Sequence, residues 1–157
     1  MKPSLLGSRM PDGAARCGVG EKILIALEVF TGLTAVAGGV LLMVRPDGSL
    51  LWIAPSALSA LAHNSPLPDF FIPGLLLAVI VGGGMLSAAT LLEQRRPYAL
   101  ELAMATGAAL MIFEIVEFAA IGFMPLQAFE GVVALVVLGM AAQRWLAALR
   151  PMLHALR

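Results

Sequence analysis

Charged residues are scarce in this chain of 157 residues: Asp, Glu, Lys and Arg make up 13% of it, whereas hydrophobic residues make up 60%. An average soluble domain contains about 25% charged residues. The mean hydropathy is +0.93, and the apolar residues are concentrated in four long runs. This composition excludes an ordinary soluble protein and predicts one integral membrane domain, with the lipid bilayer as its first partner.

The sequence also lacks the motifs of most enzymes. Its single cysteine, Cys17, excludes an intramolecular disulfide and a Cys-x-x-Cys redox pair. There is no Gly-x-Ser-x-Gly, no phosphate-binding glycine loop and no His-Glu-x-x-His. The two histidines, His63 and His154, are predicted on opposite sides of the membrane and therefore cannot ligate one haem iron. We predict no cofactor and no nucleic-acid partner, and a metal-dependent membrane enzyme is the least favoured alternative.

Four apolar runs are long enough to cross a bilayer, because about 20 residues at about 1.5 Å each span its hydrocarbon core. We predict an all-α integral membrane protein, a four-helix transmembrane bundle with a short interfacial helix between the first and second spans. The spans are placed at residues 23–44, 70–92, 98–123 and 126–145. They form one domain over residues 22–149, between a mobile cytoplasmic tail (1–21) and a second cytoplasmic tail (150–157).

The connections between spans carry further signals. Residues 49–64 repeat apolar side chains at helical spacing and are predicted as an interfacial helix broken by Pro55, or as a loop on the mouth of the bundle. Asp69 is predicted to cap the second span. Only Met124 and Pro125 separate the last two spans, so these must be antiparallel neighbours. Residues 23–37 also suit a cleavable signal peptide; Glu28 and the continuing apolar run favour an uncleaved anchor.

Basic residues predict the orientation, since short loops rich in Lys and Arg stay in the cytoplasm. With both termini inside, nine of the ten basic residues are cytoplasmic and only Arg45 is outside. The outer surface then carries Asp47 and Asp69 as well as His63. We therefore predict a multi-pass protein with both termini in the cytoplasm.

Glutamates inside the spans are the main hint of chemistry. From the outer edge, Glu130 lies about 6 Å deep, Glu117 about 9 Å and Glu114 about 14 Å, and the three converge if the last two helices turn these faces together. Glu28 belongs to the opposite leaflet. An ionised carboxylate in a membrane helix costs about 3 kcal/mol, and no Lys or Arg lies at this depth. Three ways of balancing the charge stay open: protonation with hydrogen bonds between helices, a water-filled pocket, or a bound cation.

Five residues form the candidate ligand or cation site. They are the three glutamates of the outer half, with oxygen and imidazole donors from the neighbouring loop: Glu114, Glu117, Glu130, Asp69 and His63. The Glu-x-x-Glu spacing of the third span lacks the histidine of the Glu-x-x-His motif of di-metal bundles. No particular metal is predicted.

Several short motifs recur in a known family. They are Leu27-Glu28-Val29-Phe30, Gly38-Gly39, Pro46-Asp47-Gly48, Phe71-Ile72-Pro73-Gly74-Leu75-Leu76-Leu77, and Ile121-Gly122-Phe123 ahead of Leu126-Gln127. Over roughly residues 22–143 the chain resembles small bacterial four-span membrane proteins with no assigned activity. The resemblance implies a location in the bacterial cell (inner) membrane. Glu114 and Glu117 stand where that family is expected to have an amide or apolar residues.

Two classes of function remain. The first is a non-enzymatic subunit that packs against a membrane protein partner or itself as a homo-oligomer, because small residues recur at four-residue spacing in Ala35/Gly39, Gly84/Ala88 and Ala103/Gly107. The second is a small transporter or cation-binding protein with an outward-facing acidic pocket for a cation or a cationic small molecule, because the glutamates lack basic partners.

Overall fold

The computed structural model describes residues 18–155, and the side chains of residues 18–149; residues 1–17 of the predicted tail, with Cys17, lie outside this range. Within it the chain is helical and has no strand. Four helical segments are long and apolar enough to cross a membrane, at Val19–Val44, Phe71–Glu93, Ala99–Ile121 and Pro125–Leu149. The predicted all-α, four-span bundle is therefore confirmed, and the protein is a multi-pass membrane protein.

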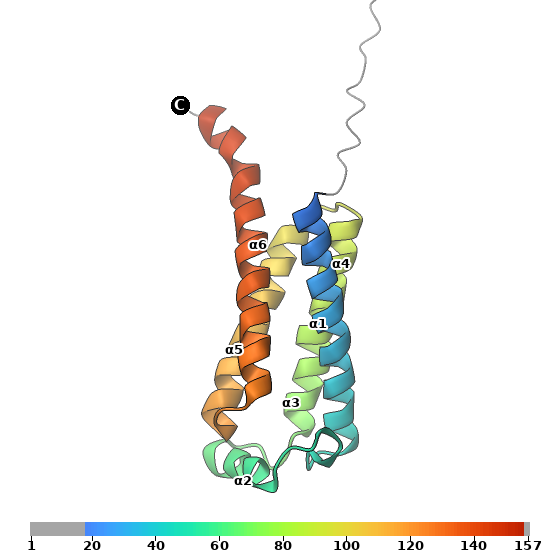
Figure 1. Ribbon diagram of the computed structural model, residues 1–157, viewed down its shortest axis with the longest axis vertical. Helices are drawn as coiled ribbons and strands as arrows, with labels where there is room; N and C mark the ends of the chain where they lie inside the picture. Colours follow the sequence, from blue (N-terminus) through green and yellow to red (C-terminus); the bar gives the residue numbers. More distant parts are fainter. Residues whose placement is uncertain (1–17, 156–157) are drawn as a thin grey trace, which may run out of the picture.

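The four spans form two antiparallel pairs (Figure 1). Helix α1 (Val19–Val44) packs along a continuous rod made of α3 (Phe71–Leu76), a π-helical segment η2 (Leu77–Gly83) and α4 (Gly84–Glu93). Helices α5 (Ala99–Ile121) and α6 (Pro125–Ala155) form the second pair, joined to the first by contacts of α5 with α4 and η2. Helix α2 (Pro55–Asn64) closes one end, called the α2 end here; the opposite end, where α1 begins and α6 ends, is called the terminal end.

Small residues hold the helices close together within this one chain. A Cβ atom on Gly39 would lie 2.7 Å from the Cβ of Ala78, and one on Gly84 would lie 2.8 Å from Cγ2 of Thr106. Similar close contacts surround Gly32, Gly82 and Gly107. Because lipid offers no hydrophobic drive for helix association, such contacts supply packing instead. The predicted small-residue pairs Ala35/Gly39, Gly84/Ala88 and Ala103/Gly107 are thus used inside the bundle.

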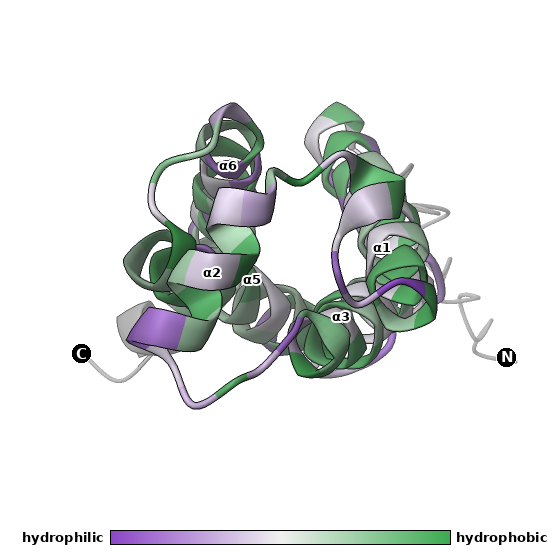
Figure 2. Ribbon diagram, turned by 90° about the horizontal axis from the view of Figure 1, so that it is seen from below, coloured by the Kyte–Doolittle hydropathy of each residue, from purple (hydrophilic) through white to green (hydrophobic). Residues whose placement is uncertain are grey.

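Helix α2 lies across the end of the bundle (Figure 2). The helical segment predicted over residues 49–64 is broken at Pro55, as expected: Ser49–Leu51 form a short 3-10 helix, and Pro55 begins α2, because the first turn needs no backbone N–H donor. The amide Nδ2 of Asn64 donates a hydrogen bond of 3.0 Å to the carbonyl oxygen of Ala120 and thereby fastens α2 to α5. Trp52, in the segment before α2, is 93% exposed, as suits a ring at a membrane boundary.

Some helix bounds differ from the predicted ones. Helix α1 includes residues 19–21 of the predicted tail, because Glu21 in its first turn pairs with Arg144 of α6 (3.6 Å). Helix α6 continues to Ala155, beyond the predicted domain end at residue 149. The second span begins at Phe71, and Oδ1 of Asp69 accepts a hydrogen bond of 2.9 Å from the Phe71 backbone N–H.

Candidate functional site

Three of the predicted site residues come together between α5 and α6. The carboxyl group of Glu114 interacts electrostatically with those of Glu130 and Glu117, and Glu117 interacts with Glu130. Glu114 and Glu117 are three residues apart on α5, and Glu130 lies in the second turn of α6. Gly122, with a φ of 86°, ends α5 and lets the chain reverse. These glutamates are called the carboxyl cluster below.

Glu114 is the most buried member of the carboxyl cluster. Its side chain is 5% exposed, and neither carboxyl oxygen has a hydrogen-bond donor among the described residues. Glu117 and Glu130 are partly exposed. Two ionised carboxylates can only accept hydrogen bonds, so Glu114 and Glu130 form a direct hydrogen bond only when one of them holds a proton. Chemically, the arrangement is suited to hold a proton or a positive charge.

Basic side chains are distant from the carboxyl cluster. Lys22, Arg95 and Arg96 lie at the terminal end, and Arg45 lies in the loop after α1. Arg144 follows Glu130 by fourteen residues on α6, which is about 21 Å along the helix. No described Lys or Arg is therefore placed to neutralise the three glutamates.

Gln127 is a polar neighbour that the sequence analysis did not assign to the site. It is 7% exposed in the first turn of α6, and its Oε1 accepts a hydrogen bond of 2.9 Å from the Met124 backbone N–H. Its amide lies beside the carboxyl group of Glu117, yet Nε2 has no acceptor within hydrogen-bond distance in the described part of the chain. The sequence could have indicated this neighbour, because Gln127 precedes Glu130 by three residues and therefore lies on the same helix face.

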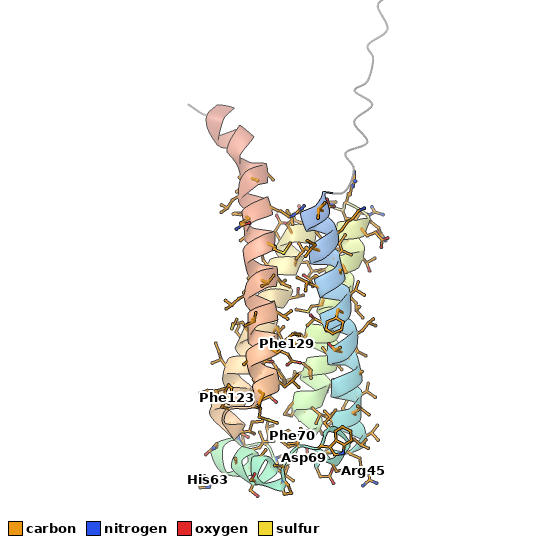
Figure 3. The ribbon with its side chains drawn as sticks, in the orientation of Figure 1. Arg45, His63, Asp69, Phe70, Phe123 and Phe129 are labelled. Carbon is orange, nitrogen blue, oxygen red and sulfur yellow. The ribbon has the colours of Figure 1, made fainter. Side chains whose placement is uncertain are left out.

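The other two predicted site residues lie apart from the carboxyl cluster. His63 is exposed on α2 and points away from the bundle, and Asp69 lies in the loop before α3 (Figure 3). Oδ1 of Asp69 is occupied by the backbone of Phe71. Across residues 18–149, no three His, Cys, Asp or Glu side chains are placed to hold a metal ion. The five predicted residues do not form one metal-ligand set.

A cavity of about 340 Å³ lies against the carboxyl cluster, between α2, α3, η2 and α5. Glu117 is the only ionisable side chain among its described lining residues. Ser65 also lines it, but its Oγ donates a hydrogen bond of 2.7 Å to the carbonyl oxygen of Leu61. The rest of the wall is apolar. Sequence periodicity could not reveal this cavity, because it depends on how three separate segments pack.

A second buried carboxyl group lies nearer the terminal end. Glu28 of α1 is 0% exposed and lies beside Thr106 of α5. Thr106 donates its hydroxyl to the carbonyl oxygen of Ala103 (3.1 Å), which leaves both oxygens of Glu28 without a donor in the described residues. Eight residues separate Thr106 from Glu114 along α5, or about 12 Å. Glu28 is therefore separate from the carboxyl cluster.

Comparisons with known proteins add no assignment. No family model, no curated protein and no solved structure matches the chain. The functional argument therefore depends on the geometry of the carboxyl cluster and of the cavity beside it.

Proposed function

We propose that this protein binds a cation inside the membrane, at the carboxyl cluster, and acts as a small transporter or cation-binding protein. The observation that carries the proposal is the buried carboxyl group of Glu114, which faces Glu130 and Glu117 and has no hydrogen-bond donor among the described residues. An acidic side chain in this setting needs a balancing charge or a proton.

The geometry favours a singly charged ligand over a coordinated divalent metal. Divalent Ca²⁺ and Mg²⁺ need several oxygen ligands at short distances, and the described residues contain no such set. A monovalent cation or an organic ammonium group needs fewer direct ligands. A cation that displaces a proton from the carboxyl cluster keeps the net charge of the cluster constant.

Orientation and location are part of the same proposal. The basic residues Lys22, Arg95, Arg96 and Arg144 gather at the terminal end, which supports a cytoplasmic position for both termini. The α2 end then faces the outside of a bacterial inner membrane, and the carboxyl cluster lies in the half of the bundle nearer to it. We also propose that the protein is a member of the family of small bacterial four-span membrane proteins that its sequence resembles.

A non-enzymatic packing subunit is the second candidate, and α6 is the helix that favours it. The positions of Gly131 and Gly139 have no atoms within 4 Å of an added Cβ. Val132 and Leu135 beside them are about 60% exposed. This face of α6 is thus open to a homo-oligomer or a membrane protein partner, whereas the predicted pairs Ala35/Gly39, Gly84/Ala88 and Ala103/Gly107 are already packed inside the bundle.

Thermal unfolding of the purified protein in detergent tests the proposal. Na⁺, K⁺, methylammonium and tetramethylammonium are added as chlorides at constant ionic strength, and the melting temperature is compared with that in the chloride of a bulky hydrophilic cation, N-methylglucamine. A ligand at about 100 times its Kd stabilises the folded state by about 2.7 kcal/mol. We expect at least one cation to raise the melting temperature, and Glu114→Gln and Glu130→Gln to abolish that increase.

Glu93→Gln is the matched control, because Glu93 is exposed at the end of α4 and should keep the full response. Proton release into a weakly buffered sample upon cation addition would identify exchange at the cluster. If no cation changes the melting temperature, or if the melting temperature of Glu114→Gln rises as much as that of the wild type, the packing subunit is the better assignment.

A further inference from the structure

The cavity and the carboxyl cluster share one residue, Glu117. Resting on the proposed function, we infer that the cavity between α2, α3, η2 and α5 binds a lipophilic monocation, an ammonium compound with an apolar body about the size of one aromatic ring. The positive group lies against Glu117 and the apolar body against the walls of α3, η2 and α5.

The shape and lining of the cavity suit an apolar body. Its volume of about 340 Å³ is at the lower end of the roughly 300–1,000 Å³ typical of small-molecule sites. Phe70, Phe113 and Val81 form part of its wall. Phe70 and Val81 are each 2% exposed, so this wall belongs to the interior of the bundle. Burial of an aromatic ring here is favoured by the apolar surface that it removes from water.

Charge complementarity specifies the polar end of the ligand. Glu117 is the single ionisable group on the described lining, and it experiences repulsion from Glu130. Glu114 lies one turn before Glu117 on α5 and adds a further acidic group. It is 5% exposed, and its carboxyl oxygens have no hydrogen-bond partner among the described residues. A cation at Glu117 relieves this repulsion, whereas a neutral or anionic ligand leaves it in place.

Access to the cavity is from the side of the bundle. Ile80 is 52% exposed, Ile112 62% and Val116 61%, and all three line the cavity and face the bilayer. Leu61 of α2, which is 4% exposed, covers the α2 end. A lipophilic cation partitions into the membrane and reaches this opening from the hydrocarbon. The π-helical segment η2 supplies one wall, and such segments are frequent at functional sites.

Isothermal titration calorimetry in detergent tests this inference. The probes are benzyltrimethylammonium and its uncharged analogue neopentylbenzene, in which carbon replaces the ammonium nitrogen. We expect the cation to bind the wild-type protein, and Glu117→Gln to weaken that binding at least tenfold. Ala109→Phe, which fills the cavity from α5, should weaken it to the same extent.

Two matched controls separate the site from the fold. Ala105→Phe adds the same ring at an exposed position of α5 outside the cavity, and Glu93→Gln removes an exposed carboxylate. Both should bind benzyltrimethylammonium like the wild type, and circular dichroism verifies that each variant is folded.

Three outcomes overturn the inference. If benzyltrimethylammonium does not bind, lipophilic monocations are not the ligands of this cavity. If it binds both Glu117→Gln and Ala109→Phe like the wild type, the binding site lies outside the cavity. Equal affinity for neopentylbenzene indicates an apolar groove for lipid chains. In each case a retained response of the melting temperature to Na⁺ or K⁺ that depends on Glu114 leaves the proposed function intact, so the two failures are distinguishable.

Discussion

Gly39→Ala tests the packing that holds the first pair of spans together. Gly39 of α1 faces the backbone of Gly74 in α3, and a Cβ atom added to it would lie 2.7 Å from both the Cβ and the backbone N of Ala78. These neighbours are backbone atoms and a methyl group, so no flexible side chain can turn away. The two helices must separate by several tenths of an ångström to admit the methyl group.

The magnitude follows from this contact. Insertion of a methyl group into a closely packed interior costs typically about 1–3 kcal/mol. The opposing gain in helix propensity from Gly to Ala is at most about 1 kcal/mol, and its usual measurement is in water. Because the added Cβ would meet backbone atoms that cannot turn away, we place the cost in the upper part of this range, about 2–3 kcal/mol. After subtraction of the propensity gain, we expect Gly39→Ala to lower the free energy of unfolding by about 1–2 kcal/mol. The measurement is SDS titration in mixed micelles with helical circular dichroism as the signal.

Gly139→Ala is the matched control, because nothing lies within 4 Å of the Cβ added on that exposed face of α6. It should unfold with the wild type or slightly later. If both variants unfold at the same SDS fraction, α1 and α3 do not approach as closely as the structure shows, and the argument from glycine packing is wrong.

Two further changes test the polar interior. Glu28→Leu should raise the free energy of unfolding by about 1–3 kcal/mol in the same SDS titration, because it removes a fully buried carboxyl group without hydrogen-bond donors in the described chain; a decrease would reveal a stabilising partner of Glu28. Asn64→Leu removes the hydrogen bond to Ala120 that fastens α2 to α5, which is worth about 1 kcal/mol. Amide hydrogen exchange in α2 should then accelerate while exchange in α1 stays unchanged, and uniform acceleration would contradict a local role.

Hydropathy was sufficient to predict the four spans, because a helix that faces lipid must be apolar over a length set by the bilayer. The meeting of Glu114 and Glu130 was also predictable. A connection of a few residues makes α5 and α6 antiparallel neighbours, and depth along each helix then follows from the rise per residue. The structure brings these two groups into interaction.

Local signals failed where tertiary contacts decide the outcome. Asp69 and His63 were assigned to the site because they offer oxygen and imidazole donors near the glutamates, but the backbone N–H of Phe71 engages Asp69 and α2 turns His63 outward. The cavity beside Glu117 depends on α2, η2 and α5 together.

An apolar layer separates the carboxyl cluster from Glu28. Val81, Leu110 and Ala134 are at most 2% exposed and pack together at the level between the two acidic positions. A protein that only binds its ligand needs no passage through this layer. A transporter must open it, which requires the spans that form the layer to shift against one another. Binding and transport therefore differ in whether this layer opens.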